Sequence, residues 1–122
     1  MTLQEIADEL VAGVRDNRTR ENLDRLYAAD AVSVEAADMG GPREARGIDA
    51  IRAKHDWWES NMDVQKADVA GPMLHLPDRF ACYFTMTVKE QATGKITDHF
   101  EVGVYTVAQG RITREEFYYP LG

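Results

Sequence analysis

Four side chains near the C-terminus have the chemical types that proton transfer requires. Glu101 and Glu116 are carboxylic acids, His99 has a near-neutral imidazole and Tyr118 carries a phenolic hydroxyl. Two carboxyl groups close together in apolar surroundings cannot both ionise cheaply, so one keeps its proton near neutral pH. Such a carboxyl can act as a general acid or base beside a carbonyl, with histidine relaying protons and tyrosine binding an oxyanion. We therefore predict these four residues as catalytic.

Each of these residues also has a purely structural interpretation. An arginine could hold the two glutamates, with Arg114 the nearest candidate, or the glutamates could lie at a wet rim. His99 could lie at the frayed end of a strand beside Asp98, and Tyr118 could be a half-buried tyrosine with its hydroxyl at the rim. The sequence leaves both interpretations open.

The catalytic interpretation depends on how the last strands pair. From residue 64 onward, apolar side chains alternate with a period of two, which predicts strands. The predicted strands are residues 64–70, 79–89, 96–107 and 111–119. Gln109 and Gly110 form the tight turn between the last two, because glycine accepts a positive φ. Counting outward from this turn, Glu101 lies opposite Tyr118 and on the same face as Glu116.

The face that carries Glu101 also has bulky apolar side chains. Pairing the predicted strand 79–89 with the predicted strand 96–107 sets Phe84 opposite Glu101 and Met86 opposite His99. We predict that this face is concave, and that Phe84, Met86 and Tyr105 bind a ligand there.

The opposite face is rich in aromatic and β-branched side chains. It is too apolar to be left fully exposed, so we predict a homodimer through this outer sheet face. The predicted members are Tyr83, Thr85, Thr87, Phe100, Val102, Val104, Thr106, Thr113, Glu115, Phe117 and Tyr119. A shift of one residue in the strand pairing would exchange the two faces.

The first third of the chain has a helical pattern. Thr2 and Glu5 have the spacing of a capping box, and apolar residues then recur at helical spacing as far as Val14. Thr19 is placed to cap a second, shorter helix. A short strand is predicted at residues 31–36.

A glycine-containing loop precedes a third helix, predicted at residues 47–62. His55 and Trp58 lie on the apolar face of this helix, where core packing is the alternative to ligand contact. We predict that both bind ligand, together with Met39 in the preceding loop.

Composition and motifs exclude several classes of protein. The 122 residues carry a net charge of −7 and a single cysteine, Cys82. The charge argues against a nucleic-acid or membrane surface, and one cysteine excludes an internal disulfide. We find no paired histidines for a metal and no nucleotide-binding glycine motif, so we predict no metal and no cofactor. An acidic N-terminus without a long apolar run predicts a cytoplasmic protein.

Three segments resemble the SnoaL-like branch of the nuclear transport factor 2-like superfamily. They are LYAADAVSVEA, GIDAIRAKHDWW and the closing hairpin EVGVYTVAQGRITREEFYY. The resemblance covers nearly the whole chain and implies one SnoaL-like domain over residues 1–122. The implied fold is α+β: a cone-shaped, curved antiparallel (mixed) β-sheet wrapped around three N-terminal helices, also described as a cystatin-like α+β barrel. A pocket is expected at the open end of the cone.

The resemblance also implies a range of functions. We expect a small-molecule pocket protein: a cofactor-free acid–base enzyme of isomerase, cyclase or dehydratase type, acting on a small apolar carbonyl-containing ligand. The alternative is a non-catalytic ligand-binding or dimerisation module. Steroid-isomerase-like members use an acid from an early strand, where this chain offers Glu35 or Asp38. Cyclases use a late-strand aspartate, and this chain has Glu101 in that neighbourhood.

Overall fold

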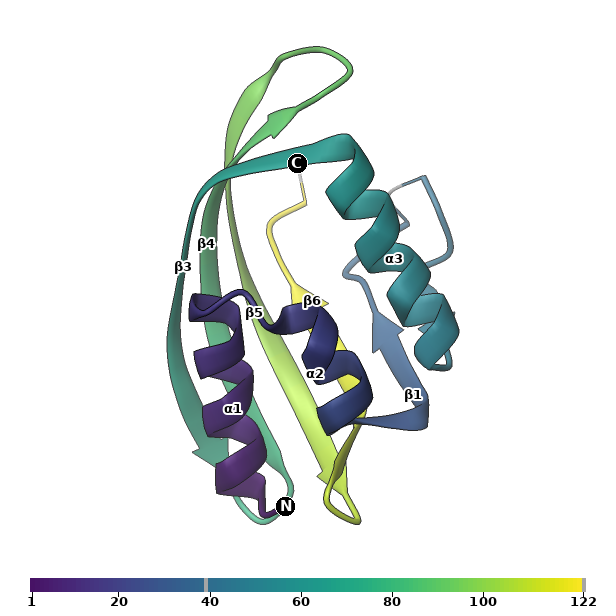
Figure 1. The fold of residues 1–122 in the computed structure, drawn as a ribbon, viewed down its shortest axis with the longest axis vertical. Coiled ribbons are helices and arrows are strands. Elements are labelled where there is room, and N and C mark those ends of the chain that lie inside the picture. Colours follow the sequence, from purple (N-terminus) through teal and green to yellow (C-terminus); the bar gives the residue numbers. More distant parts are fainter. Residues whose placement is uncertain (39, 122) are drawn as a thin grey trace.

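Three helices lie on the concave side of a strongly curved sheet (Figure 1). The structure, a computed structural model, describes residues 1–38 and 40–121. The elements are α1 (Leu3–Arg15), α2 (Thr19–Leu26), β1 (Tyr27–Val34), β2 (Glu44–Arg46), α3 (Ile48–Asn61), β3 (Met62–His75), β4 (Arg79–Glu90), β5 (Ile96–Ala108) and β6 (Arg111–Tyr118).

The described strands form one six-stranded sheet in the order β2-β1-β6-β5-β4-β3. All neighbours pair antiparallel except β1 and β6, which run parallel. The sheet is therefore mixed and open, with β2 and β3 as its edges. This arrangement confirms the predicted α+β cone.

The capping box at the first helix is confirmed, but the second helix begins differently from the prediction. Thr2 Oγ1 accepts a hydrogen bond from the Glu5 amide, and the Thr2 amide donates to the Glu5 carboxylate. Thr19 is already inside α2, whose N-cap is Arg18 without a side-chain bond. The Arg18 amide donates to the Gly13 carbonyl as α1 ends, and α2 begins one residue earlier than predicted. Among the described residues, no helix is long and apolar enough to cross a membrane.

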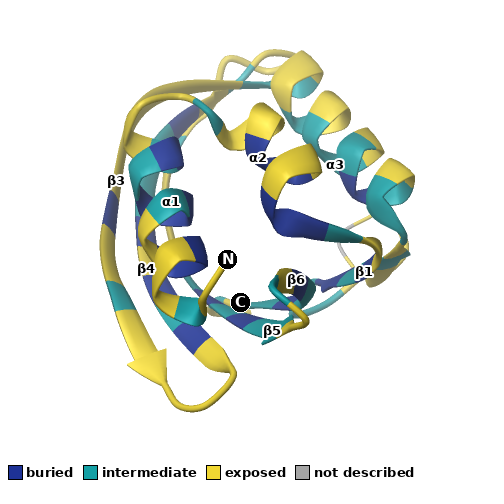
Figure 2. Cartoon of the chain, turned by 60° about the horizontal axis from the view of Figure 1, so that its bottom comes forward, coloured by how far each residue is buried: buried dark blue, intermediate teal, exposed yellow. Residues whose placement is uncertain are grey.

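The core lies between the three helices and the concave face of the sheet. The buried side of α1 faces the strands and its exposed side faces outward, as Figure 2 shows. The helical stripe predicted from the sequence supplies Ile6, Leu10 and Val11, which belong to one core cluster with residues from β1, β3, β4, β5 and β6. The fully buried large side chains include Leu23, Leu26, Ile51, Phe80 and Ile112.

The largest differences from the predicted strands are at β1, β2 and β3. β1 begins at Tyr27 rather than at residue 31, because it pairs with β6, which is distant in the sequence. β2 lies within the segment predicted as an irregular loop and pairs with β1. β3 continues beyond Gly71 and Pro72 to His75, with a register shift that accommodates the two residues.

The register between β4 and β5 is as predicted. Phe84 lies opposite Glu101, and Met86 lies opposite His99. The tight turn at Gln109 and Gly110 is also confirmed, with φ values of 54° and 74°.

The last strand has a β-bulge that the sequence prediction lacked. Val107 pairs with Ile112, but the next pair joins Thr106 to Arg114, so Thr113 is an extra residue. Because a one-residue shift reverses the alternation of side chains, Glu116 and Tyr118 turn to the outer face. Their predicted place on the concave face is wrong.

The residues assigned to the outer face of that strand move inward in exchange. Glu115 lies opposite Tyr105 and Phe117 lies opposite Gly103, so both belong to the concave face. Tyr119 follows the same alternation and reaches Glu35. The strand therefore still contributes one carboxyl and two aromatic rings to the interior, from neighbouring positions in the chain.

Candidate functional site

A buried carboxylate lies at the junction of β1 and β6. Glu115 is 3% exposed and accepts hydrogen bonds on both carboxylate oxygens. Tyr27 donates to Oε1, and Ser33 Oγ donates to Oε2 at 2.7 Å. Burial raises the pKa of Glu115, while the two hydroxyl donors act in the opposite direction. The hydroxyls thus stabilise the negative charge that burial disfavours.

A lysine of α3 connects this carboxylate to a second one. Lys54 Nζ donates to Ser33 Oγ at 2.8 Å and forms an ion pair with Glu35 at 2.9 Å. The same ammonium lies 5.6 Å from the centre of the Phe117 ring, within reach of a cation–π interaction. The Tyr119 hydroxyl donates to the other Glu35 oxygen at 3.2 Å. One network therefore joins α3, the end of β1 and the chain after β6.

Glu101 lies close to this network but does not join it. Its half-buried carboxyl projects from β5, and among the described residues none hydrogen-bonds to it or forms an ion pair with it. Burial raises the pKa of Glu101 from its ordinary 4.5 to about 7. The negative charges of Glu35 and Glu115 add to this rise, and Lys54 opposes it. Glu101 can therefore exchange a proton near neutral pH.

A tyrosine hydroxyl lies further along the same face of β5. Tyr105 is 3% exposed, and its ring stacks on Phe80 at 4.8 Å between centroids. Its hydroxyl makes no hydrogen bond to any residue that the structure describes. Burial raises the pKa of Tyr105 well above its ordinary range, so the hydroxyl keeps its proton and can donate a hydrogen bond.

Gly103 provides the space between Glu101 and Tyr105. A Cβ at Gly103 would lie 3.0 Å from the Tyr105 hydroxyl and 3.1 Å from the Phe84 ring. These distances are tighter than most real Cβ contacts, so the two rings would have to shift by a few tenths of an ångström. The missing side chain therefore lets both rings fold over β5 beside Glu101.

Burial along β5 shows which end of the cone is open. Tyr105 and Gly103 are buried, Glu101 is half-buried and His99 is exposed. The His99 ring lies edge-on to Trp58 of α3, with 6.5 Å between ring centroids, and its Nε2 lies 2.8 Å from Thr97 Oγ1. The open end therefore lies between α3 and the exposed part of β5.

The family assignment follows from comparison with known proteins. The SnoaL-like domain family matches residues 1–119. The chain belongs to this family. A crystal structure of a candidate SnoaL-like polyketide cyclase from Mesorhizobium loti is 36% identical, with a TM-score of 0.91 and coverage of 98% of this chain and 100% of that chain.

Two more distant crystal structures share the fold of this SnoaL-like domain. An NTF2-like protein from Burkholderia thailandensis is 17% identical, with a TM-score of 0.84 and coverage of 98% of this chain and 92% of that chain. A Xanthomonas campestris protein with a cystatin-like fold is 14% identical, with a TM-score of 0.74 and coverage of 99% and 92%. Among curated proteins, none matches the chain.

The SnoaL-like domain brings some of the predicted site residues together. Glu101, Tyr105, Phe84 and Met86 all project from the concave face, with Phe84 buried and Met86 packed against the core. His99 and Trp58 meet at the open end. His55 is half-buried on α3, and burial lowers the pKa of its imidazole.

Two predicted catalytic residues are separated from the interior. Glu116 forms an ion pair with Arg114 at 3.3 Å, which was its structural alternative in the sequence. Tyr118 is 54% exposed on the outer face. The predicted ligand-binding Met39 lies outside the described residues.

Sequence reasoning missed the network that surrounds Glu101. Lys54 follows the buried Ile51 by three residues and precedes Trp58 by four, a spacing that places it on the inward side of α3. Of the two early acids that the family resemblance offered, Glu35 belongs to the network, whereas Asp38 bonds to the Gly40 amide in an exposed loop. Among the described residues, no group of three metal-ligating side chains could hold a metal ion.

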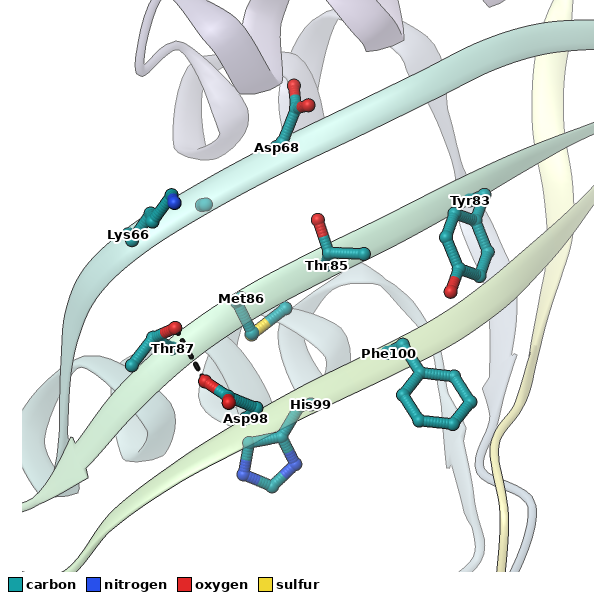
Figure 3. Close-up of a pocket in the computed structure, with 10 residues that line it drawn as sticks. Lys66, Asp68, Tyr83, Thr85, Met86, Thr87, Asp98, His99 and Phe100 are labelled. Atoms are coloured by element: carbon teal, nitrogen blue, oxygen red, sulfur yellow. Dashed lines mark hydrogen bonds between the residues drawn. The ribbon is translucent and has the colours of Figure 1, made fainter.

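Two hollows lie on the surface formed by the described residues, and neither is enclosed within the cone. One of about 260 Å³ lies on the outer face of β3, β4 and β5, where Figure 3 shows Tyr83, Thr85 and Phe100. The side chains of Met86 and His99 lie behind these strands, on the concave side. The other hollow, of about 130 Å³, opens at the ends of β1 and β6 beside Glu35.

Proposed function

We propose that this SnoaL-like domain is a cofactor-free acid–base enzyme in which Glu101 moves a proton on a small, largely apolar carbonyl compound. The observation that carries the proposal is the contrast between two neighbouring carboxyls. Both oxygens of Glu115 accept hydrogen bonds, whereas no described residue binds Glu101. A pKa of about 7 keeps both forms of Glu101 populated at neutral pH, as a general acid or base requires.

The proposed step uses Glu101 and Tyr105 together. The Glu101 carboxylate removes a proton from the carbon next to the carbonyl, and the C–H electrons form a carbon–carbon double bond. The carbonyl oxygen gains the negative charge and accepts a hydrogen bond from Tyr105, whose hydroxyl has no described partner. Return of the proton from Glu101 to another carbon completes an isomerisation. In a cyclisation, the enolate carbon instead attacks a second carbonyl of the same molecule, and Glu101 returns its proton to the new alkoxide oxygen.

Charge and lining support a neutral, flat ligand. The side chains at the open end include Trp58, Met86 and Phe117, which offer apolar and aromatic surface. Glu35, Glu101 and Glu115 are three carboxyls against one lysine, so a carboxylate or phosphate on the ligand would be repelled. The Mesorhizobium loti relative is named both as a candidate SnoaL-like polyketide cyclase and as a carbohydrate phosphatase, and the first of these names fits an interior that disfavours phosphate.

Proton exchange in D₂O tests this function directly. We expect the protein to accelerate exchange of the α-protons of β-tetralone, an apolar enolisable ketone, as followed by ¹H NMR. Glu101→Gln should reduce that rate by about 100-fold or more, because a general base is lost. The control is Glu116→Gln, which changes a neighbouring glutamate on the outer face and should leave the rate unchanged.

The alternative function, a non-catalytic binding module, predicts a different pair of results. It requires that the ketone binds, as measured by calorimetry, without any accelerated exchange. It also requires that Glu101→Gln leaves binding intact. That combination would replace the enzyme proposal.

We also propose that a second copy of the chain covers the outer sheet face. Phe100 is 50% exposed and Tyr83 is 38% exposed, and both line the hollow on this face. Lys66 lies in the same hollow as Asp68 and Asp98. A two-fold axis through this face could therefore set the lysine of one copy against an aspartate of the other.

A further inference from the structure

Lys54 of α3 contacts the network of Glu35, Ser33 and Glu115 that lies beside Glu101. Its side chain is 30% exposed and reaches inward from α3 across the Phe117 ring. The titratable groups that face Glu101 come from several packed elements. They are Lys54 from α3, Glu35 after the end of β1, Tyr105 from β5 and Glu115 from β6. Tyr27 of β1 and Cys82 of β4 face Glu115 and Tyr105 in the next layer of the same interior.

The hydrogen bonds of Lys54 have only one possible direction. An ammonium group donates and cannot accept, so Ser33 Oγ must accept from Lys54 at 2.8 Å. The single hydroxyl hydrogen of Ser33 is then left for the Glu115 carboxylate at 2.7 Å. Ser33 thus transmits the polarising effect of the ammonium to a carboxylate that Lys54 does not touch.

Lys54 also neutralises a second acid at the same time. Its ion pair with Glu35 spans 2.9 Å, and Tyr119 donates to the free oxygen of that carboxylate. Two of the three carboxyls therefore have described donors on both of their oxygens. Glu101 has no such donor among the described residues.

We propose that Lys54 is a positioning residue that keeps Glu115 a carboxylate by acting through Ser33. The exchangeable proton of the site is thereby left on Glu101, and this inference rests on the function proposed above. Without the ammonium, Glu115 would compete with Glu101 for the proton.

The experiment compares the full-length protein with Lys54→Met and Lys54→Arg. Methionine keeps most of the aliphatic stem and removes the charge, while arginine keeps the charge. The carboxyl carbons of Glu101 and Glu115 are titrated by ¹³C NMR, with Glu101→Gln and Glu115→Gln used for assignment. We expect the Glu115 midpoint to rise by about 1 pH unit in Lys54→Met and to stay at the wild-type value in Lys54→Arg.

A purely structural role for Lys54 would give another result. Lys54→Met would then lower the stability to urea, and the Glu115 midpoint would be the same as in the wild type. That outcome would overturn the inference.

Lys54→Gln keeps the test decisive if Lys54→Met does not fold. It removes the charge but retains a group that can donate to Ser33 Oγ. The Glu115 midpoint should again rise relative to Lys54→Arg, and an unchanged midpoint would contradict the inference. The proposed function is judged separately by the wild-type midpoint of Glu101, which would be near 4.5 rather than 7 if that function were wrong.

Discussion

Ser33 lies directly opposite Glu115 in the parallel ladder between β1 and β6, and its hydroxyl donates to the Glu115 carboxylate at 2.7 Å. The two residues are 82 positions apart in the chain. The only parallel pair among the described strands thus places a hydroxyl of the first strand on a carboxylate of the last. The chemistry of the interior depends on this pairing, because the antiparallel hairpin of β5 and β6 alone provides Glu115 with neither hydroxyl donor.

The first prediction concerns the hydroxyl donors to Glu115. Ser33→Ala or Tyr27→Phe should each lower the free energy of unfolding by about 1.5 to 3 kcal/mol at pH 7. The physical reason is that a buried carboxylate loses a donor that no water can replace. Urea unfolding followed by circular dichroism measures the loss.

The matched control for these donors is a hydroxyl–carboxylate pair on the outer face. Thr87 Oγ1 donates to Asp98 at 2.7 Å, and this hydrogen bond is exposed, with Thr87 half-buried and Asp98 accessible to water. Thr87→Val should cost less than about 1 kcal/mol, because water takes the place of the lost donor. Equal losses at Ser33 and Thr87 would contradict the importance of burial at Glu115.

The second prediction is a change in the pH dependence of stability. The folded state raises the pKa of Glu101 from 4.5 to about 7, so between these values the folded state holds a proton that the unfolded state releases. Stability therefore falls as the pH rises through this window. Glu101→Gln should remove this fall and stabilise the protein at pH 8 by about 2 to 3 kcal/mol, with little change at pH 4.

Glu116→Gln is the control for the pH prediction. Glu116 is on the outer face and pairs with Arg114, so its replacement should change stability by less than about 1 kcal/mol at either pH. Urea titrations at pH 4 and pH 8 give the comparison. If Glu101→Gln were no more stabilising at pH 8 than at pH 4, Glu101 would not be the carboxyl with the raised pKa.

The fold was largely predictable because its elements have strong local signals. The capping box at Thr2, the helix ending at Asn61 and the turn at Gln109 and Gly110 each follow from residues close together in the chain. The family resemblance then supplied the cone. The position where β1 begins was not predictable in this way, because its first residue, Tyr27, pairs with β6.

The site was predictable only in part because a bulge has no local signal here. With or without an extra residue at Thr113, β6 offers the interior one glutamate and at least one aromatic residue. Glu115 and Phe117 face inward in the structure, whereas a regular strand would present Glu116 and Tyr118. The alternation of polar and apolar side chains therefore cannot distinguish the two registers.

The third prediction concerns the space at Gly103. Gly103→Ala would place a methyl group about 3 Å from the rings of Tyr105 and Phe84. Buried aromatic rings can move only by disturbing their neighbours, so we expect a loss of about 1 to 3 kcal/mol in unfolding free energy. Gly41→Ala is the control, because a Cβ there meets nothing within 4 Å and its φ is not positive. Similar losses for the two variants would show that Gly103 is not a packing constraint.

The fourth prediction tests the proposed dimer through the outer sheet face. Phe100→Asp puts a charge among the exposed side chains of this face, and a second copy would have to bury that charge. We expect light scattering after size-exclusion chromatography to show a wild-type dimer and a monomeric variant. Trp57→Asp is the control: Trp57 is 58% exposed on α3, on the concave side of the sheet, and the variant should remain dimeric. A monomeric wild type, or a dimer that Phe100→Asp leaves intact, would show that this face is not the interface.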